Sequence, residues 1–92
     1  MVLALAVGVL LVTAAPSPAP VAPRDCGMMT VKGQRYQVKA DQIPCRRARR
    51  WAEAYLAHHT RPSGYHCKGF DSSTALEFRC SKGIRVFFAI RR

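Results

Sequence analysis

The chain has 92 residues, a length that excludes more than one domain of ordinary size. Its 15 Lys and Arg residues outnumber 5 Asp and Glu residues, which gives a net charge of +10 at pH 7. All the basic residues lie between Arg24 and Arg92, and a field of this strength on one small domain attracts polyanions. A GC-rich genome or selection for solubility would produce a similar composition, so charge alone does not assign a partner.

The amino-terminal segment predicts an exported precursor. Residues 2–12 form an uncharged apolar run, far shorter than the roughly 20 residues of a membrane-spanning helix but as long as the core of a secretory signal. Small residues follow it, and Pro16 disfavours cleavage directly before it, so we expect a signal peptide at 1–14 that is cut after Ala14. A short buried helix of the mature fold is the alternative. Since no Lys or Arg precedes the apolar run, a start upstream of Met1 is left open.

The sequence after the signal indicates a linker followed by one secreted domain. Four prolines within residues 15–24 favour an extended polyproline conformation without a core. We therefore assign 15–24 to a Pro/Ala-rich linker and 25–92 to a small basic domain. Once the signal is removed, we expect an extracellular protein without a membrane span.

The domain contains four cysteines, Cys26, Cys45, Cys67 and Cys80. In an oxidising compartment an even number of cysteines predicts two disulfides, for which three pairings exist. A zinc site is the competing interpretation, but spacings of 19, 22 and 13 residues contain no close Cys pair of the kind that binds zinc. We predict two disulfides, which would compensate for a core too small to stabilise the domain alone, and neither a metal site nor a cofactor.

The first half of the domain predicts a hairpin and a helix. Segments 28–31 and 34–40 flank a Lys-Gly turn, and the second alternates apolar and polar residues as a half-buried strand does. One longer strand with a glycine bulge is the alternative. Residues 41 to about 59 form the helix, with Asp41 as a candidate N-cap and Pro44 in the first turn. Its apolar residues share one face: Cys45, Ala48, Trp51, Ala52, Tyr55 and Leu56.

The second half predicts a meander of three strands. The strands occupy 65–70, 75–80 and 84–90, with turns at 71–74 and 81–83. Alternation places three residues of the middle strand on one face, Leu76, Phe78 and Cys80. By the same spacing we assign four aromatic residues to the core, Trp51, Tyr55, Phe78 and Phe88. Three others fall on opposite faces and are expected to be partly exposed, Tyr65, Phe70 and Phe87.

The register of the meander predicts the disulfide pairing. A hairpin centred between Ser73 and Thr74 places Cys67 opposite Cys80, close to the separation that a disulfide requires. The remaining pair, Cys26 and Cys45, would tie the amino-terminal arm to the first turn of the helix. The predicted fold is therefore α+β, with one amphipathic helix packed on a small, disulfide-stapled antiparallel sheet.

The candidate anion-binding residues lie on the helix and near one turn. They are Arg46, Arg47, Arg49 and Arg50 on the helix, and Lys82 and Arg85 near the last turn. Arg91 and Arg92 form a further basic group at the tail. No helix-turn-helix, zinc-finger or RNP-like signature accompanies these charges, so we expect no specific recognition of nucleic acid.

No catalytic residue is assigned. A small basic ribonuclease would need two histidines that converge on a phosphate, and the chain has His58, His59 and His66. Adjacent helical side chains point about 100° apart, so at most one of the first two could meet His66. The serines lie in expected turns without a nucleophile-elbow pattern, and the carboxylates are spread out. We therefore expect a protein that is not an enzyme.

Several spaced residues resemble a pattern in small secreted actinobacterial proteins of uncharacterised function. The resemblance spans about residues 36 to 88 and rests on Cys45-x-x-Ala48-Arg49, Tyr55, Gly64-Tyr65-x-Cys67 and Cys80-x-x-Gly83-x-x-Val86-x-Phe88. Related chains often have Trp where this chain has Tyr65. The resemblance implies secretion, a helix-plus-meander layout and a bacterial cell-envelope setting, and it implies no activity.

These observations predict a secreted basic binding module. Its expected partner is an anionic cell-envelope polymer or an acidic protein, and its expected contacts are the arginines of the helix. The alternative is an inhibitor or toxin-like effector that acts on a protein target. A small hydrolase such as a ribonuclease is the least favoured function.

Overall fold

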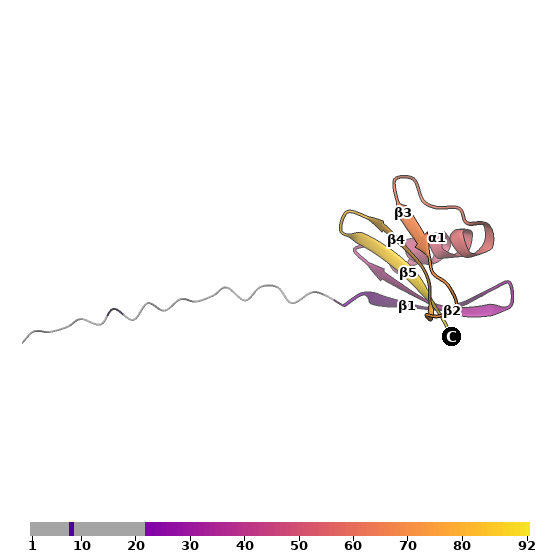
Figure 1. The fold of residues 1–92 in the computed structure, drawn as a ribbon. Helices are drawn as coiled ribbons and strands as arrows, with labels where there is room; N and C mark the ends of the chain where they lie inside the picture. Colours follow the sequence, from indigo (N-terminus) through magenta and orange to yellow (C-terminus); the bar gives the residue numbers. More distant parts are fainter. Residues whose placement is uncertain (1–7, 9–21) are drawn as a thin grey trace, which may run out of the picture.

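The computed structural model describes residue 8 and residues 22–92, and these carry one helix and five strands (Figure 1). The elements are β1 (Arg24–Val31), β2 (Gln34–Asp41), α1 (Cys45–His58), β3 (His66–Gly69), β4 (Leu76–Lys82) and β5 (Arg85–Arg91). The expected disulfide-stapled α+β fold is confirmed. The sheet begins at Arg24, one residue before the expected start of the domain. The expected signal peptide and nearly all of the linker lie outside the described residues.

All neighbouring strands of the single sheet are antiparallel, in the order β1-β2-β5-β4-β3. The first hairpin and the last three strands were each expected, and the structure joins them by pairing β2 with β5. In this join Val38 lies opposite Ala89, and Ala40 lies opposite Phe87. β5 is therefore the central strand, with two strands on either side.

Both expected disulfides are confirmed. Cys67 and Cys80 are direct partners in the β3–β4 pairing, and the distance between their Cα atoms is 4.0 Å. Cys26 of β1 bonds to Cys45, the first residue of α1, with a Cα–Cα distance of 5.1 Å. One disulfide closes the β3–β4 hairpin, and the other ties the edge strand β1 to the helix.

The helix packs on one face of the sheet through small side chains. Ala48 and Ala52 are fully buried, which allows the helix backbone to approach the sheet closely. Larger aromatic rings fill the space beside them. The ring centroid of Trp51 lies 5.8 Å from that of Phe87, and the Tyr55 and Phe78 centroids are 4.4 Å apart. Tilted ring contacts of this kind add to the free energy gained by burying apolar area.

The prediction of which aromatic residues are buried was wrong at three positions. Phe87 has no exposed surface and Tyr65 is only 6% exposed, whereas both were expected on outer faces. Phe88, expected in the core, is half-buried on the other face. The reason is the β2–β5 register, which sets Phe87 beside Ala40 beneath the helix. Tyr65 turns inward to contact Trp51, with ring centroids 5.2 Å apart.

Leu76 also departs from its expected face. The β4–β5 register shifts between Leu76 and Phe78, so that Leu76 lies opposite Ile90 while Phe78 lies opposite Ala89. The irregularity breaks the alternation that had grouped Leu76 with Phe78 and Cys80. Leu76 is half-buried and does not belong to the residues that pack against the core.

Two boundaries differ from the prediction. Asp41 is not an N-cap but the last residue of β2, opposite Val86, because the alternation of the strand continues through it. The chain then turns at Gln42, which has a positive φ of 60°, and Pro44 occupies the N-cap position without a side-chain hydrogen bond. The last turn lies between Lys82 and Arg85, which are paired. Ile84 is therefore a turn residue, 75% exposed, and not part of a strand.

No helix in residues 22–92 is long and apolar enough to cross a membrane.

Replacing both cysteines of either disulfide with alanine should lower the free energy of unfolding by about 3 kcal/mol, because the unfolded chain gains the entropy of an open loop. The two loops span 13 and 19 residues, so we expect similar losses for Cys67→Ala/Cys80→Ala and Cys26→Ala/Cys45→Ala. Urea denaturation of the two variants and the oxidised parent measures the effect. A loss below about 1 kcal/mol for either pair would contradict a stabilising role.

Candidate anion-binding site

Three arginines at the start of α1 surround a surface hollow. Arg46, Arg47 and Arg50 line it together with Pro44, and its volume is about 250 Å³. The helix places them together because residues three and four apart share a face. All three are exposed, while Ala48 on the opposite face is buried against the sheet. The amphipathic pattern thus presents a cluster of guanidinium groups to solvent.

No salt bridge joins this arginine hollow to an acidic residue of the described chain; the nearest acid along the helix, the exposed Glu53, follows Arg50 by three positions. The first turn of α1 contains no acidic residue, and no side chain caps it. Over residues 22–92, the one salt bridge joins Arg91 and Glu77, whose Nε and Oε2 atoms are 3.2 Å apart. The guanidinium of Arg47 lies 5.7 Å from the centre of the Trp51 ring, a cation–π contact that orients the side chain without cancelling its charge.

Two of the acidic residues instead accept hydrogen bonds in a strand bulge and in a turn, both distant in sequence from the hollow. Asp25 accepts a hydrogen bond from the Gly27 amide at 2.9 Å, and this bond is the main cause of the lowered pKa of its carboxyl. The Ser73 hydroxyl and amide donate to Asp71 and lower the pKa of that carboxyl. Hydrogen bonds to the charged form favour ionisation. These carboxylates therefore support local backbone structure and do not pair with the arginine hollow.

Arg49, expected to bind anions with its neighbours, occupies a different environment. Its Nη1 donates hydrogen bonds to the carbonyl oxygens of Cys26 and Met28, at 2.9 and 3.1 Å. These carbonyls flank Gly27, where the β1–β2 register shifts and φ is +89°. Arg49 therefore secures the bulge of β1 against α1. Charge and spacing did not distinguish Arg49 from its neighbours, and the one signal was the resemblance pattern Cys45-x-x-Ala48-Arg49, which contains none of the other three.

Lys82 and Arg85 lie at the end of the sheet where α1 begins. They pair with each other across the last turn, and the neighbouring pair of Val86 with Asp41 sets Arg85 beside the strand end that leads into the helix. Lys82 lies against Gly64, where an added Cβ would come within 3.0 Å of its Nζ. Both side chains therefore extend the positive charge of the arginine hollow along the same end of the sheet.

The two carboxyl-terminal arginines lie at the opposite end and make internal contacts. Arg91 pairs with Glu77 and also donates to the Thr74 carbonyl oxygen. Arg92 donates through Nε to Oε1 of Gln37 at 2.9 Å. The structure separates this tail group from the arginine hollow, since β5 runs the length of the sheet between them.

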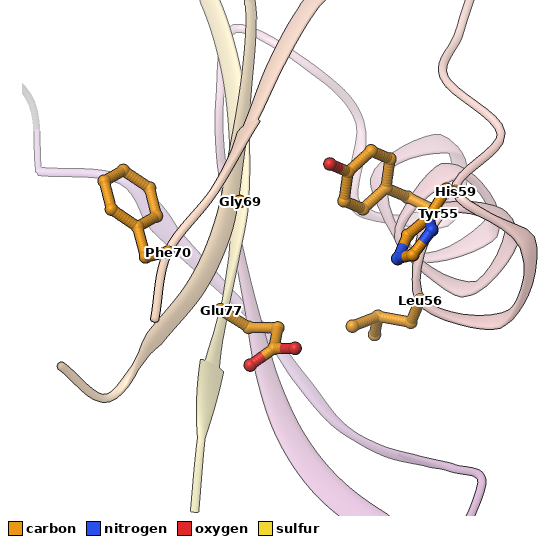
Figure 2. A pocket seen from close by; sticks show the side chains of 6 residues that line it. All are labelled: Tyr55, Leu56, His59, Gly69, Phe70 and Glu77. Atoms are coloured by element: carbon orange, nitrogen blue, oxygen red, sulfur yellow. The ribbon is translucent and has the colours of Figure 1, made fainter. Parts of the chain in front are cut away.

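A second hollow, of about 170 Å³, lies between the end of α1 and the β3–β4 hairpin. Figure 2 shows the side chains of Tyr55, His59 and Leu56 facing the carboxylate of Glu77 across it. Gly69 also lines this hollow, whereas the ring of Phe70 points away from the helix (Figure 2).

The histidines are not gathered at this second hollow. His59 lines it, but His66 begins β3 and lies opposite Ser81, near the other end of the sheet. The structure therefore does not bring His66 together with either helical histidine. No group of three or more potential metal ligands forms within the described part of the chain.

No family model, curated protein or solved structure matches this chain.

Arg49→Ala should lower the free energy of unfolding by about 2 kcal/mol, because two carbonyl groups lose a charged donor. Arg50→Ala is the matched control on the adjacent, exposed position, and we expect a change within about 0.5 kcal/mol. Thermal or urea denaturation of both variants measures the difference. Equal effects would show that Arg49 does not hold the β1 bulge.

Proposed function

We propose that this protein is a secreted, non-enzymatic module that binds an anionic polymer of the cell envelope through Arg46, Arg47 and Arg50. The observation that carries the proposal is the hollow that these three exposed arginines line, none of them held in a salt bridge within the described chain. Lys82 and Arg85 extend the same charged end of the domain. The proposed ligand is therefore long enough to contact both groups.

The chemistry of arginine favours a phosphate- or carboxylate-bearing ligand. Each guanidinium offers a rigid fork of donors that matches two oxygens of such a group, and it stays charged at any physiological pH. The contact with the Trp51 ring holds Arg47 in place, so less side-chain entropy is lost on binding. The hollow is shallow and open at the surface, a shape suited to a polymer that crosses it.

An envelope setting is supported by the two disulfides and by the amino-terminal sequence. Disulfides persist in oxidising compartments, where no reducing system breaks them, and two of them stabilise this small domain. The uncharged apolar segment at 1–14 has the features of a secretory signal. The resemblance to small secreted actinobacterial proteins points to the same location.

An acidic protein would contact the same charges, but its binding would depend on salt concentration in a different way. A protein interface excludes water from an apolar centre and so resists salt, whereas contacts to a flexible polyanion are lost as salt displaces them. The large hydrophobic residues that residues 22–92 expose, Met28 and Ile84, both lie outside α1, so its arginines do not surround an apolar centre, which favours the polyanion. If the protein were instead an inhibitor or effector of one protein target, its binding would resist salt.

The test measures retention of the oxidised protein on purified cell-wall sacculi, with and without their anionic polymer, across a salt gradient. The variant Arg46→Gln/Arg47→Gln/Arg50→Gln should bind intact sacculi roughly 10- to 100-fold more weakly, since three exposed charge contacts are lost. The slope of log affinity against log salt should fall by about two.

The matched control is Lys32→Gln/Arg35→Gln/Arg61→Gln, which removes three exposed positive charges away from the hollow. It should retain most of the parent affinity. If both variants lose binding equally, the interaction follows net charge and not this hollow. Retention that ignores salt, or that persists after the anionic polymer is stripped, would contradict the proposal and favour a protein partner.

A further inference from the structure

The sheet has a second face that no element of the described chain covers. α1 packs on one side, in contact with β1, β2 and β5, and residues 22–92 form no other helix (Figure 1). The central strand nevertheless carries apolar residues to the other side. Five large hydrophobic residues of the sheet and its loops are half-buried but lie outside the set that packs against the core: Phe70, Leu76, Val86, Phe88 and Ile90. A water-soluble sheet that faces solvent ordinarily alternates apolar and polar residues, so these five need an explanation.

The strand register aligns three cations with Phe88 in one row across this face. Lys68 lies opposite Arg79, Arg79 opposite Phe88, and Phe88 opposite Lys39. The row ends on β1 at Asp25, which lies opposite Lys39 and whose carboxylate accepts a hydrogen bond from the Gly27 amide. Neighbouring strands are about 4.8 Å apart, so Arg79 and Lys39 flank the Phe88 ring on both sides. We call this row, with Phe70, the open face.

Phe70 supplies a second aromatic ring at the edge of the open face. Figure 2 shows it pointing away from the helix side of the sheet. The Nζ atom of Lys68 lies 5.4 Å from the centre of its ring. Two rings, each beside a cation, are thereby exposed in part on one flat surface.

We propose that the open face binds single-stranded nucleic acid without sequence preference. Unpaired bases stack on exposed aromatic rings, while lysine and arginine beside the rings contact the phosphates. An uncovered antiparallel sheet is a surface that offers both contacts at once, as it does in known RNA-binding sheets. The open face contains these parts in one row: Phe88 between Arg79 and Lys39, and Phe70 beside Lys68.

Charge and ring chemistry together favour this occupant over others. A second copy of the chain would bring +10 against +10 across a face that carries three cations, so self-association is disfavoured. A polyphosphate chain without rings would use the cations but not Phe88 or Phe70. A nucleic acid duplex keeps its bases stacked inside and would also leave both rings unused. Unpaired bases on a phosphate backbone use both the rings and the cations of the row.

This proposal is independent of the proposed envelope function, because the two surfaces differ. The arginine hollow lies at the start of α1, and the open face lies on the side of the sheet away from α1. A substitution without any change of charge can therefore separate them. Phe88 is the residue of choice, since it is outside the core cluster.

The experiment measures binding of a fluorescent twelve-nucleotide oligothymidylate to the oxidised protein by anisotropy at physiological salt. Phe88→Ala should weaken binding roughly 10- to 100-fold, the usual effect of removing one stacking ring. Phe88→Tyr keeps the ring and should bind like the parent. Lys39→Gln/Arg79→Gln should lower the slope of log affinity against log salt by about one, compared with Lys32→Gln/Arg61→Gln, which removes two charges elsewhere.

The outcomes decide the two proposals separately. Unchanged retention of Phe88→Ala on sacculi, together with its weakened binding of oligothymidylate, is the expected pattern. The open-face proposal is overturned if the parent does not bind the oligonucleotide, if Phe88→Ala binds it as well as the parent, or if a duplex of equal length binds more tightly than the single strand. Circular dichroism shows whether Phe88→Ala is folded, and if it is not, Phe70→Ala is measured in its place with the same expected direction.

Discussion

The pairing of β2 with β5 is the interaction on which the rest of the molecule depends. One disulfide lies wholly within the first half, between β1 and α1, and the other wholly within the second, between β3 and β4. No covalent bond joins the two halves apart from the chain itself. They are held together by the β2–β5 ladder and by the aromatic contacts of Trp51 and Tyr55 with Phe87 and Phe78. We call these non-covalent contacts the seam. Their free energy decides whether the two disulfide-linked halves form one domain.

The same seam assembles both charged surfaces. It sets Arg85, from the second half, beside the strand end that leads to the arginines of α1. On the other side of the sheet it sets Lys39 of the first half beside Phe88 of the second. The arginine hollow itself belongs to the first half, but neither half alone would place Arg85 near it or form the row across the open face. Folding and the arrangement of cations are thus coupled through one set of strand contacts.

Patterns with a local physical cause could be predicted from the sequence, and those set by long-range contacts could not. The hairpin register placed Cys67 opposite Cys80 correctly, because a turn fixes the pairing of the strands it joins. Residues 86–90 are apolar throughout, so alternation could not decide whether Phe87 or Phe88 faced the helix. The pairing with β2, which places Ala40 opposite Phe87, determines that Phe87 faces the helix. Likewise, the charge of Arg49 is that of its neighbours, and its structural role follows from the distant bulge at Gly27.

The distribution of the acidic residues bears on whether the charge serves only solubility. Of the five, Asp25, Asp41 and Asp71 accept hydrogen bonds from residues one or two positions away, and Glu77 pairs with Arg91. The fifth, Glu53, lies exposed on α1 three residues after Arg50. A surface that is charged only for solubility intersperses both signs. Here four of the acids stabilise turns and strand ends, while the arginine hollow and the row across the open face, with three cations and Asp25, keep an excess of positive charge. The resulting self-repulsion opposes folding, and the two disulfides offset it by destabilising the unfolded chain. The disulfides and the unpaired cations are therefore connected features, since the former allow a domain of this size to keep the latter available for a ligand.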